Sequence, residues 1–372
     1  MKFTCTRENL AKALQLTSGI TTKPGNLPIL SNVLLKVSES GVEVITTNLE
    51  LAITSHLRAK VDTAGEYTVP AKILNDYVNL LSDEQVTVSR EENELLVECG
   101  SSSTKIKGIE ADEYPVIPTM SEGNVYGFET GVLKEALAQV VFAAAKNDIR
   151  PELAGVYCGF NAKDAGKLTI AATDSYRLAE RSLAIKEGQE NQEVIIPARA
   201  IIEFIRLLSV QGGTEDIVHI KLTGNQVGIQ LDGGEIISRL VDGTYPDYRQ
   251  IIPENFATEI VFDKDVAQKN IKAASLFTTT GINAVHFNVD SKVKQLIMTS
   301  TNTQAGAHAS SVDVEITGDD NEILLNHKYV LDGLGKIDTS DIMLGVNSKD
   351  SPCVFSGREK NDYKYIVMPI RQ

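Results

Sequence analysis

The sequence has few cysteines, and they form no pattern typical of a metal site or a disulfide framework. The cysteines Cys5, Cys99, Cys158 and Cys353 stand far apart, and none belongs to a CxxC pair. Zinc modules and disulfide-stapled domains need cysteines, or cysteines and histidines, at short and regular spacings. We therefore expect reduced thiols packed within strands, and we expect neither a metal nor a cofactor.

Long apolar runs are also missing. No uninterrupted stretch approaches the ~18 residues that a membrane-spanning helix needs, and residues 1–7 (MKFTCTR) contain no apolar segment of the kind found in a signal peptide. The sequence therefore predicts a cytoplasmic protein that does not associate with membranes.

Positive charge is in short supply. The 372 residues include 36 Lys and Arg against 50 Asp and Glu, which gives a formal net charge of -14. Such a surface repels phosphate as a whole, so a protein that coats nucleic acid through its overall charge is a poor candidate. The 42% apolar and 23% charged residues are ordinary for a folded protein, and the length predicts two or three domains.

One pattern recurs at about a third of the chain length. An extended segment at Phe3, Phe128 and Phe262 comes before each of three expected helices, at 9–17, 132–145 and 266–275. Apolar strands are then expected at 29–37, 155–161 and 284–289. A further strand in each repeat ends in a small polar signature that contains Asn48, Asp174 or Asn302, and these positions are 126 and 128 residues apart.

The second half of each repeat follows the same plan. Strands expected at 66–70, 193–197 and 322–326 run into helices expected at 71–81, 198–208 and 327–334, and more alternating strands follow. Each repeat is thus two similar halves of the form strand, helix, several strands. We interpret the chain as an α+β protein with three domains of one fold, at 1–125, 126–253 and 254–372.

No catalytic motif is present. The sequence has no GxxxxGK[ST], no GxGxxG that opens a helix, no HExxH and no GxSxG, and its histidines are scattered. Asp174 and Asp247 could be imagined as an acid–base pair. Because Asn48 and Asn302 occupy the place of Asp174 in the other repeats, a turn in which this side chain binds nearby backbone is favoured. We expect that the protein is not an enzyme.

Several expected helices carry a basic stripe opposite their apolar face, taking 100° per residue. Arg199 and Arg206 share one stripe, and Lys269 and Lys272 share another. On these wheels Val266 and Ile73 fall on the apolar faces. The basic residues of the remaining stripes are Lys72 and Lys12. Each cation alone can be an ordinary solvated residue, whereas their recurrence favours a surface that binds DNA phosphates, and both interpretations stay open.

Four short motifs, in this order on a threefold repeat, closely resemble the bacterial DNA polymerase III beta subunit family, the sliding clamps. They are Leu27-Pro28-Ile29-Leu30, Thr173-Asp174-Ser175-Tyr176-Arg177-Leu178-Ala179, Tyr245-Pro246-Asp247-Tyr248 and Tyr365-Ile366-Val367-Met368-Pro369-Ile370-Arg371. The resemblance covers the whole chain.

The resemblance implies a processivity factor for DNA polymerase. Two protomers would close head to tail into a six-domain ring around duplex DNA, with helices lining the hole and sheets forming the outer wall. The implied partners are a second copy of the chain, double-stranded DNA, the replicative polymerase, the clamp loader, and other replication and repair proteins that carry a clamp-binding peptide. The alternatives are a repeat-built scaffold that binds only proteins and a hydrolase with an unrecognised acid–base pair.

The resemblance also implies site residues. A pocket for partner peptides between the second and third domains would comprise Leu153, Thr173, Ser175, Tyr176, Arg177, Leu178, Pro246, Gln250, Ile251, Asn326, Tyr329, Val367, Met368, Pro369, Ile370 and Arg371. Core packing is the alternative for Leu153 and Leu178. Gln250 replaces the Arg of many relatives, and Gln372 replaces an aliphatic end.

By the same resemblance, further DNA contacts would come from the loop with Lys23 and from the turn with Asn147 and Arg150. Pro151 and Glu152 stand beside that turn where relatives can carry aromatic residues. The strand with Thr104 and Ile106 would meet the region around Ser275 and Leu276 of the neighbouring protomer.

Overall fold

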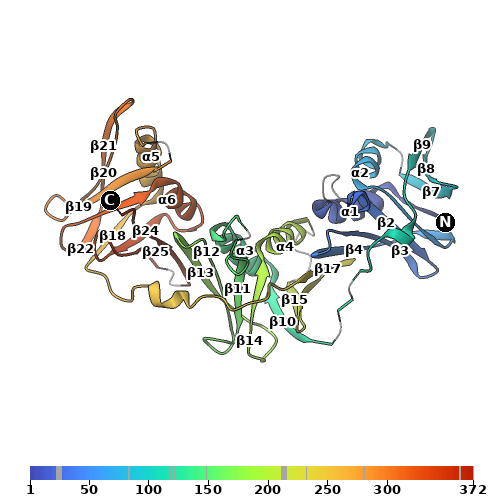
Figure 1. Cartoon of the computed structure of the whole chain (residues 1–372), viewed down its shortest axis with the longest axis horizontal. Coiled ribbons are helices and arrows are strands. Elements are labelled where there is room, and N and C mark those ends of the chain that lie inside the picture. Colours follow the sequence, from blue (N-terminus) through green and yellow to red (C-terminus); the bar gives the residue numbers. More distant parts are fainter. Residues whose placement is uncertain are drawn as a thin grey trace. The chain divides into compact units, whose positions relative to one another are not determined.

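The computed structural model in Figure 1 describes residues 1–21, 27–82, 84–117, 119–120, 122–147, 149–210, 216–231, 233–279, 281–359 and 362–371. Lys23 and Gln372 lie outside the described residues. The described chain falls into two compact units. The first comprises Met1–Lys134, Ile185–Gly188 and Arg199–Leu240, and the second comprises Glu135–Ala184, Gln189–Ala198 and Val241–Gln372. No helix within the described ranges is long and apolar enough to span a membrane.

The first unit contains two antiparallel sheets. Sheet A has the order β5(Lys60–Thr63), β1(Lys2–Thr6), β7(Gln85–Glu91), β8(Glu94–Cys99), β9(Ser102–Lys107). Sheet B has the order β10(Asn124–Glu129), β15(Ile217–Leu222), β16(Gln226–Leu231), β17(Gly234–Arg239), β4(Leu51–Leu57), β3(Gly41–Thr47), β2(Asn32–Ser38), β6(Gly65–Pro70). In sheet B, β17 pairs with β4 from Gly234 opposite Ser55 to Ser238 opposite Leu51, so strands of the first and middle repeats form one sheet.

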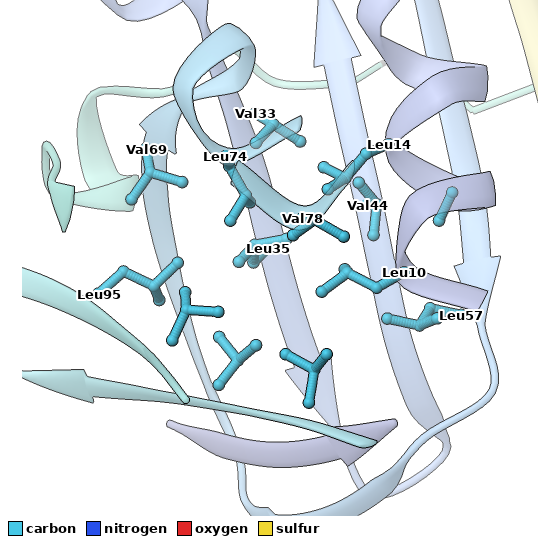
Figure 2. Close-up of a cluster of buried hydrophobic side chains, with 14 of the residues drawn as sticks. Leu10, Leu14, Val33, Leu35, Val44, Leu57, Val69, Leu74, Val78 and Leu95 are labelled. Atoms are coloured by element: carbon cyan, nitrogen blue, oxygen red, sulfur yellow. The ribbon is translucent and has the colours of Figure 1, made fainter. Parts of the chain in front are cut away.

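Helices pack on these sheets through their apolar faces. The helix α1(Arg7–Thr17) begins where the Thr6 side chain accepts a hydrogen bond from the Asn9 amide. The helix α2(Ala71–Leu80) contacts α1, and most of α4(Ala198–Val210) belongs to this unit. Figure 2 shows side chains of α1 and α2 directed toward those of the strands, with labels on Leu10, Leu14, Leu74, Val78, Val33, Leu35 and Val44. Each such fully buried side chain contributes about 1.5–3 kcal/mol to folding.

The second unit also contains two antiparallel sheets. Sheet C has the order β14(Gln192–Pro197), β11(Gly155–Phe160), β12(Lys167–Thr173), β13(Arg177–Ala184), β26(Tyr363–Val367), β25(Cys353–Gly357), β24(Asp341–Val346), β18(Thr258–Asp263), β22(Glu315–Gly318). Sheet D has the order β21(Gly306–Asp313), β20(Gln295–Asn302), β19(Ala284–Asp290), β23(Asn321–Asn326). In sheet C, β13 pairs with β26 from Arg177 opposite Val367 to Arg181 opposite Tyr363, which joins the middle and last repeats.

The remaining helices begin at or two residues before the positions that the repeat predicts, and the helix expected at 132–145 ends at Val140, where the 3-10 turn at Val141–Ala143 follows. These helices are α3(Thr130–Val140), α5(Lys264–Ser275) and α6(His327–Leu334). Side-chain oxygens of Asp263 and Asn326 accept backbone hydrogen bonds at the starts of α5 and α6. The short 3-10 turns are η1(Ser18–Ile20), η2(Pro28–Ser31), η3(Ala111–Glu113), η4(Val141–Ala143) and η5(Tyr248–Ile251).

This architecture confirms the α+β prediction and the two similar halves of each repeat. The cysteines are free and buried within strands, as expected, and burial raises the pKa of Cys5 to about 12. The strand expected at 29–37 was wrong at its start, because η2 occupies Pro28–Ser31 and β2 begins at Asn32. The fixed φ of Pro28 suits the first position of a helical turn, which closes through a hydrogen bond from the Leu30 amide to the Leu27 carbonyl.

Two helical faces also differ from the expectation. Ile73 of α2 is 55% exposed and Val266 of α5 is 44% exposed, although both were placed on apolar, buried faces. Both residues lie in the first turn of their helices. The 100° periodicity gives the angular position of a side chain but not the extent of the surface that covers it.

Candidate functional site

A repeated turn places the central residues of the candidate site. The Oδ1 atom of Asp174 accepts hydrogen bonds from the backbone amides of Tyr176 and Arg177, each at 3.0 Å, and the Thr173 hydroxyl donates to the Arg177 carbonyl at 2.7 Å. Ser175 takes a left-handed φ of 76°. The Oδ1 atom of Asn48 binds the amides of the second and third residues after it, and so does that of Asn302. The predicted turn role of Asp174 is therefore confirmed.

Arg177 leaves this turn toward the interior and is only 5% exposed. Its guanidinium forms ion pairs with Asp174 at 3.1 Å and with Asp332 of α6 at 2.7 Å, and it donates to the Phe142 carbonyl at 3.0 Å. Burial opposes its charged form, but the nearby Tyr365, Asp332 and Asp174 side chains raise its pKa above the ordinary value. Arg177 is thus a paired buried cation that joins β13, α6 and η4 to one another.

The Arg177 guanidinium also contacts two aromatic rings, those of Tyr329 and Phe142. It is 4.8 Å from the ring centroid of Tyr329 and 5.2 Å from that of Phe142. The Tyr329 ring stacks on the Tyr176 ring with 6.5 Å between centroids, and Tyr176 is 64% exposed. The cation–π contact with Arg177 thus holds the Tyr329 ring in place, and the Tyr176 ring that stacks on it faces solvent.

The last described residues of the chain border the stacked rings of Tyr176 and Tyr329. The amide of Met368 donates to the Tyr176 carbonyl at 2.9 Å, and the amide of Ile370 donates to the Leu324 carbonyl of β23 at 2.8 Å. Residues 368–370 are half-buried and Arg371 is exposed. We call the surface formed by Tyr176, Tyr329 and residues 368–371 the tail site. It lies within the second unit and combines aromatic, aliphatic and thioether groups.

A buried cluster supports the tail site from below. Leu153 and Leu178 are 3% and 0% exposed and belong to this cluster, so these two predicted pocket residues pack in the core. Tyr245 of the same cluster accepts a hydrogen bond at its hydroxyl from the Thr173 amide, at 3.1 Å. The Tyr248 hydroxyl donates to the buried Glu180 carboxylate at 2.7 Å. The cluster therefore links η5 to the strand ends that carry the turn.

The other predicted pocket residues have differing surroundings. Pro246 is half-buried, and Ile251 is 40% exposed. Gln250 is exposed, and its amide nitrogen donates to the Asp247 carboxylate at 2.8 Å. Asn326 caps α6 through the Lys328 amide, and Val367 is fully buried at the end of β26. The structure brings Tyr176, Tyr329 and the tail together, and it leaves Val367 in the core beside them.

Two neighbours of Arg177 were missed by the sequence analysis, namely Phe142 and Asp332. Asp332 is 155 residues away from Arg177 in the sequence, and no local pattern marks either position. A buried arginine needs an acceptor, so Asp332 could have been found by a search for acidic residues on the helix expected at 327–334. Phe142 contributes a backbone carbonyl and a ring face, and neither leaves a sequence signal.

Apart from Arg206, the predicted DNA-facing residues that the structure describes fall into two groups. Lys12, Arg199, Lys269 and Lys272 have exposed positions on α1, α4 and α5, and Asn147 is exposed after η4. Lys72 is exposed but pairs with Asp76 one turn along α2, and Arg150 pairs with Glu152 at 2.9 Å. The charges of this second group are partly compensated, which weakens any attraction to phosphate.

Arg206 has a different contact from the one expected for a stripe residue. Its Nη1 and Nη2 donate to the Gln15 and Leu16 carbonyls at 3.0 and 2.6 Å, and its Nε donates to Glu203 at 2.7 Å. These carbonyls end α1, where the helix dipole favours a cation. Arg206 therefore joins α4 to α1 within the first unit.

We expect Arg206→Ala to lower the free energy of unfolding by about 2–3 kcal/mol, because it leaves the carbonyls of α1 and the Glu203 carboxylate without their charged partner. Urea unfolding followed by circular dichroism measures the change. Arg199→Ala removes an exposed cation from the same helix and is the matched control, with an expected loss below about 0.5 kcal/mol. Equal midpoints for the two variants would contradict a joining role for Arg206.

The predicted dimer contacts lie near two open sheet edges. In the part of the chain that the structure describes, β9 pairs only with β8, and β21 pairs only with β20. Thr104 of β9 is half-buried, but Ile106 is 5% exposed and belongs to the core of the first unit. Leu276, just after α5, is 74% exposed, and the Ser275 hydroxyl donates to the Lys272 carbonyl. Leu276 is therefore an available contact, whereas Ile106 supports β9 from inside.

Comparison with known proteins agrees with this architecture. The N-terminal, central and C-terminal domain models of the DNA polymerase III beta subunit match residues 1–118, 128–247 and 249–371. The beta sliding clamp of Synechococcus elongatus is 30% identical over 100% of this chain and 99% of its own length. The DNA polymerase III beta subunit of Thermotoga maritima has a crystal structure with a TM-score of 0.94 and 27% identity, over 100% of this chain and 99% of that one.

A third relative was solved with a ligand. The sliding clamp of Pseudomonas aeruginosa bound to griselimycin has a TM-score of 0.91 and 28% identity, with 100% of each chain covered. The domain models cover nearly the whole sequence in the order of the three repeats. This chain belongs to the DNA polymerase III beta subunit family, the family of the bacterial sliding clamps.

Proposed function

We propose that this chain is the sliding clamp that makes a bacterial replicative DNA polymerase processive, without catalysis of its own. The observation that carries the proposal is the match of all three family domains in order along the chain. The match does not favour a scaffold that binds only proteins. The protein works in the cytoplasm, where bacterial DNA is replicated.

Two copies close head to tail in this proposal. The open edges β9 and β21 belong to different repeats and carry different sequences, so their contact is heterologous and two equal contacts close a ring. Three of the other edge strands have further backbone contacts, since Ile109 bridges to Thr68 on β6, Glu187 bridges to Gly127 on β10, and Ile370 binds Leu324 on β23. The three domains, with boundaries near residues 125 and 253, give six around the ring.

Double-stranded DNA passes through this ring. The exposed cations Lys12, Arg199, Lys269 and Lys272 contact phosphates, and the turn with Asn147 and Arg150 contributes further contacts. Contacts to phosphate carry no sequence information, so the ring holds the duplex at any position and can move along it. The net charge of -14 keeps direct affinity low. Retention on DNA then comes from closure.

Partner proteins bind at the tail site. The replicative polymerase, the clamp loader and other replication and repair proteins insert apolar side chains of a short peptide against Tyr176, Tyr329 and Met368. The remaining predicted pocket residues Thr173, Ser175, Arg177, Pro246, Gln250, Ile251 and Asn326 shape or support this surface. An exposed aromatic ring beside an adaptable Met suits several partners, and a relative that binds griselimycin supports a ligand surface in the family.

Primer extension tests this function. The replicative polymerase, with its clamp loader and ATP, is supplied with a primed single-stranded circle, with and without this protein. We expect much longer products in a single binding event when the protein is present. Products of unchanged length, in a reaction where the protein still binds a polymerase-derived peptide, would favour the protein-only scaffold.

A further inference from the structure

Three buried polar atoms near the junction of the middle and last repeats lack a hydrogen bond to the protein. They are the Nε atom of Arg181, the hydroxyl of Tyr363 and the Oε1 atom of Gln139, and none of them has a partner in the part of the chain that the structure describes. The three residues are 8%, 3% and 5% exposed. Buried polar atoms are almost always hydrogen-bonded, either to protein or to ordered water, so these three require an explanation.

Arg181 and Tyr363 share one face of sheet C. Arg181 of β13 lies directly opposite Tyr363 of β26, and the side chains of directly opposite residues stand side by side. Arg177, four residues before Arg181 on β13, belongs to the same face and binds Asp332 of α6. The face that carries Arg181 and Tyr363 is therefore the one that α6 covers.

Gln139 of α3 approaches the same place through Asp338, which follows α6. The Nε2 atom of Gln139 donates to the Lys336 carbonyl at 3.0 Å and to the Asp338 carboxylate at 2.8 Å. Burial raises the pKa of Tyr363 well above its ordinary value, and two charges nearby also act on it, since Arg181 lowers it and Asp338 raises it. Asp338 is thus a neighbour of both Gln139 and Tyr363.

The hydrogen-bonding capacity left over at this place is mixed. The Gln139 amide has one possible orientation, because its nitrogen faces two acceptors and a reversed amide would set its oxygen against them. Gln139 therefore leaves an acceptor, whereas the Nε–H of Arg181 is a donor and the Tyr363 hydroxyl can be either. The charge of Arg181 is already paired with Asp362 at 2.6 Å. A neutral molecule that donates and accepts fits these groups, whereas a cation would meet the Arg181 N–H and an anion the Gln139 oxygen.

We propose that this place binds an ordered water molecule, which accepts hydrogen bonds from Arg181 and Tyr363 and donates one to Gln139. Three hydrogen bonds are typical of a buried water. The water would join α3 and β13 of the middle repeat to β26 of the last repeat. The inference concerns the junction of these repeats and does not depend on binding of DNA or of partner peptides.

A high-resolution crystal structure of the full chain tests the water directly. We expect a density peak at hydrogen-bond distance, about 2.7–3.2 Å, from Arg181 Nε, Tyr363 Oη and Gln139 Oε1. Direct hydrogen bonds among these three side chains would overturn the proposal, and so would the absence of a peak from well-ordered density.

Tyr363→Phe provides a test in solution, because the sign of its effect differs between a hydrated and a dry junction. If the hydroxyl binds water, its removal loses a hydrogen bond, and we expect the melting temperature of the full chain to fall by about 1–3 °C. If the hydroxyl is buried without any partner, its removal relieves an unpaired polar group and raises the melting temperature. A rise or an unchanged melting temperature would overturn the proposal.

Tyr365→Phe is the matched reference for this measurement. Tyr365 lies two residues along β26 on the same face, and its hydroxyl donates directly to the Tyr329 carbonyl at 2.8 Å. Its removal lowers the melting temperature whether or not the water is present, so this variant shows that the loss of one hydrogen bond can be detected. Falls in both variants would support the water, whereas a fall in Tyr365→Phe alone would show that the hydroxyl of Tyr363 has no partner.

Discussion

Deletion of residues 368–372 is expected to abolish binding of partner peptides and to leave the fold intact. Strand β26 ends at Val367, so the sheet keeps all its pairs. The deletion removes the backbone hydrogen bonds of Met368 and Ile370 to Tyr176 and Leu324, together with the side chains that border the stacked rings. Loss of such a surface costs at least about 2.7 kcal/mol, or a hundredfold in affinity, in fluorescence polarisation with a polymerase-derived peptide.

Met368→Ala is the milder partner of this deletion. It keeps the backbone hydrogen bonds and removes one half-buried side chain, so we expect about a tenfold loss of affinity. Thermal unfolding controls for the fold, and both proteins should unfold near the wild-type temperature. Wild-type affinity in a folded deletion protein would show that partners bind at another surface.

The second large effect separates two residues that the sequence analysis assigned to one interface. Leu276→Lys places a charge on a side chain that is 74% exposed, so we expect folded monomers in analytical ultracentrifugation. Ile106→Asp places a carboxylate in the core beside Leu95, with which Ile106 pairs across β8 and β9. We expect this second variant to lose about 3–5 kcal/mol of unfolding free energy.

Val293→Lys is the control for the dimer variant. Val293 is 59% exposed and lies in the turn between β19 and β20, so the same substitution there should leave the dimer unchanged. A dimer that survives Leu276→Lys would remove Leu276 from the contact. A stable, monomeric Ile106→Asp protein would show instead that Ile106 acts at the interface and not in the core.

The sequence predicted the features that repeat or alternate. The helix starts at 71, 198 and 327 were predicted because an apolar strand leads directly into an apolar periodicity of 3.6 in each repeat. The turn of Asp174 was predicted because Asn48 and Asn302 have the same acceptor at the same place, and only a local backbone role suits all three.

Contacts between distant segments were beyond such patterns. Arg206 appeared as one more stripe residue, because nothing in α4 indicates that the carbonyl end of α1 lies beside it. Ile106 is buried in a core cluster drawn from distant strands and helices, although its own strand is mostly polar.

Release from cut DNA tests encirclement most directly. The protein is loaded onto nicked circular DNA by a clamp loader, and the complexes are separated by gel filtration before and after a restriction enzyme linearises the circle. A closed ring escapes from a circle only by opening a protein interface, whereas it runs off a linear end. We expect the protein to remain with the circle and to separate from the linear DNA. Equal retention on the two would contradict encirclement and indicate a protein that binds the side of the duplex.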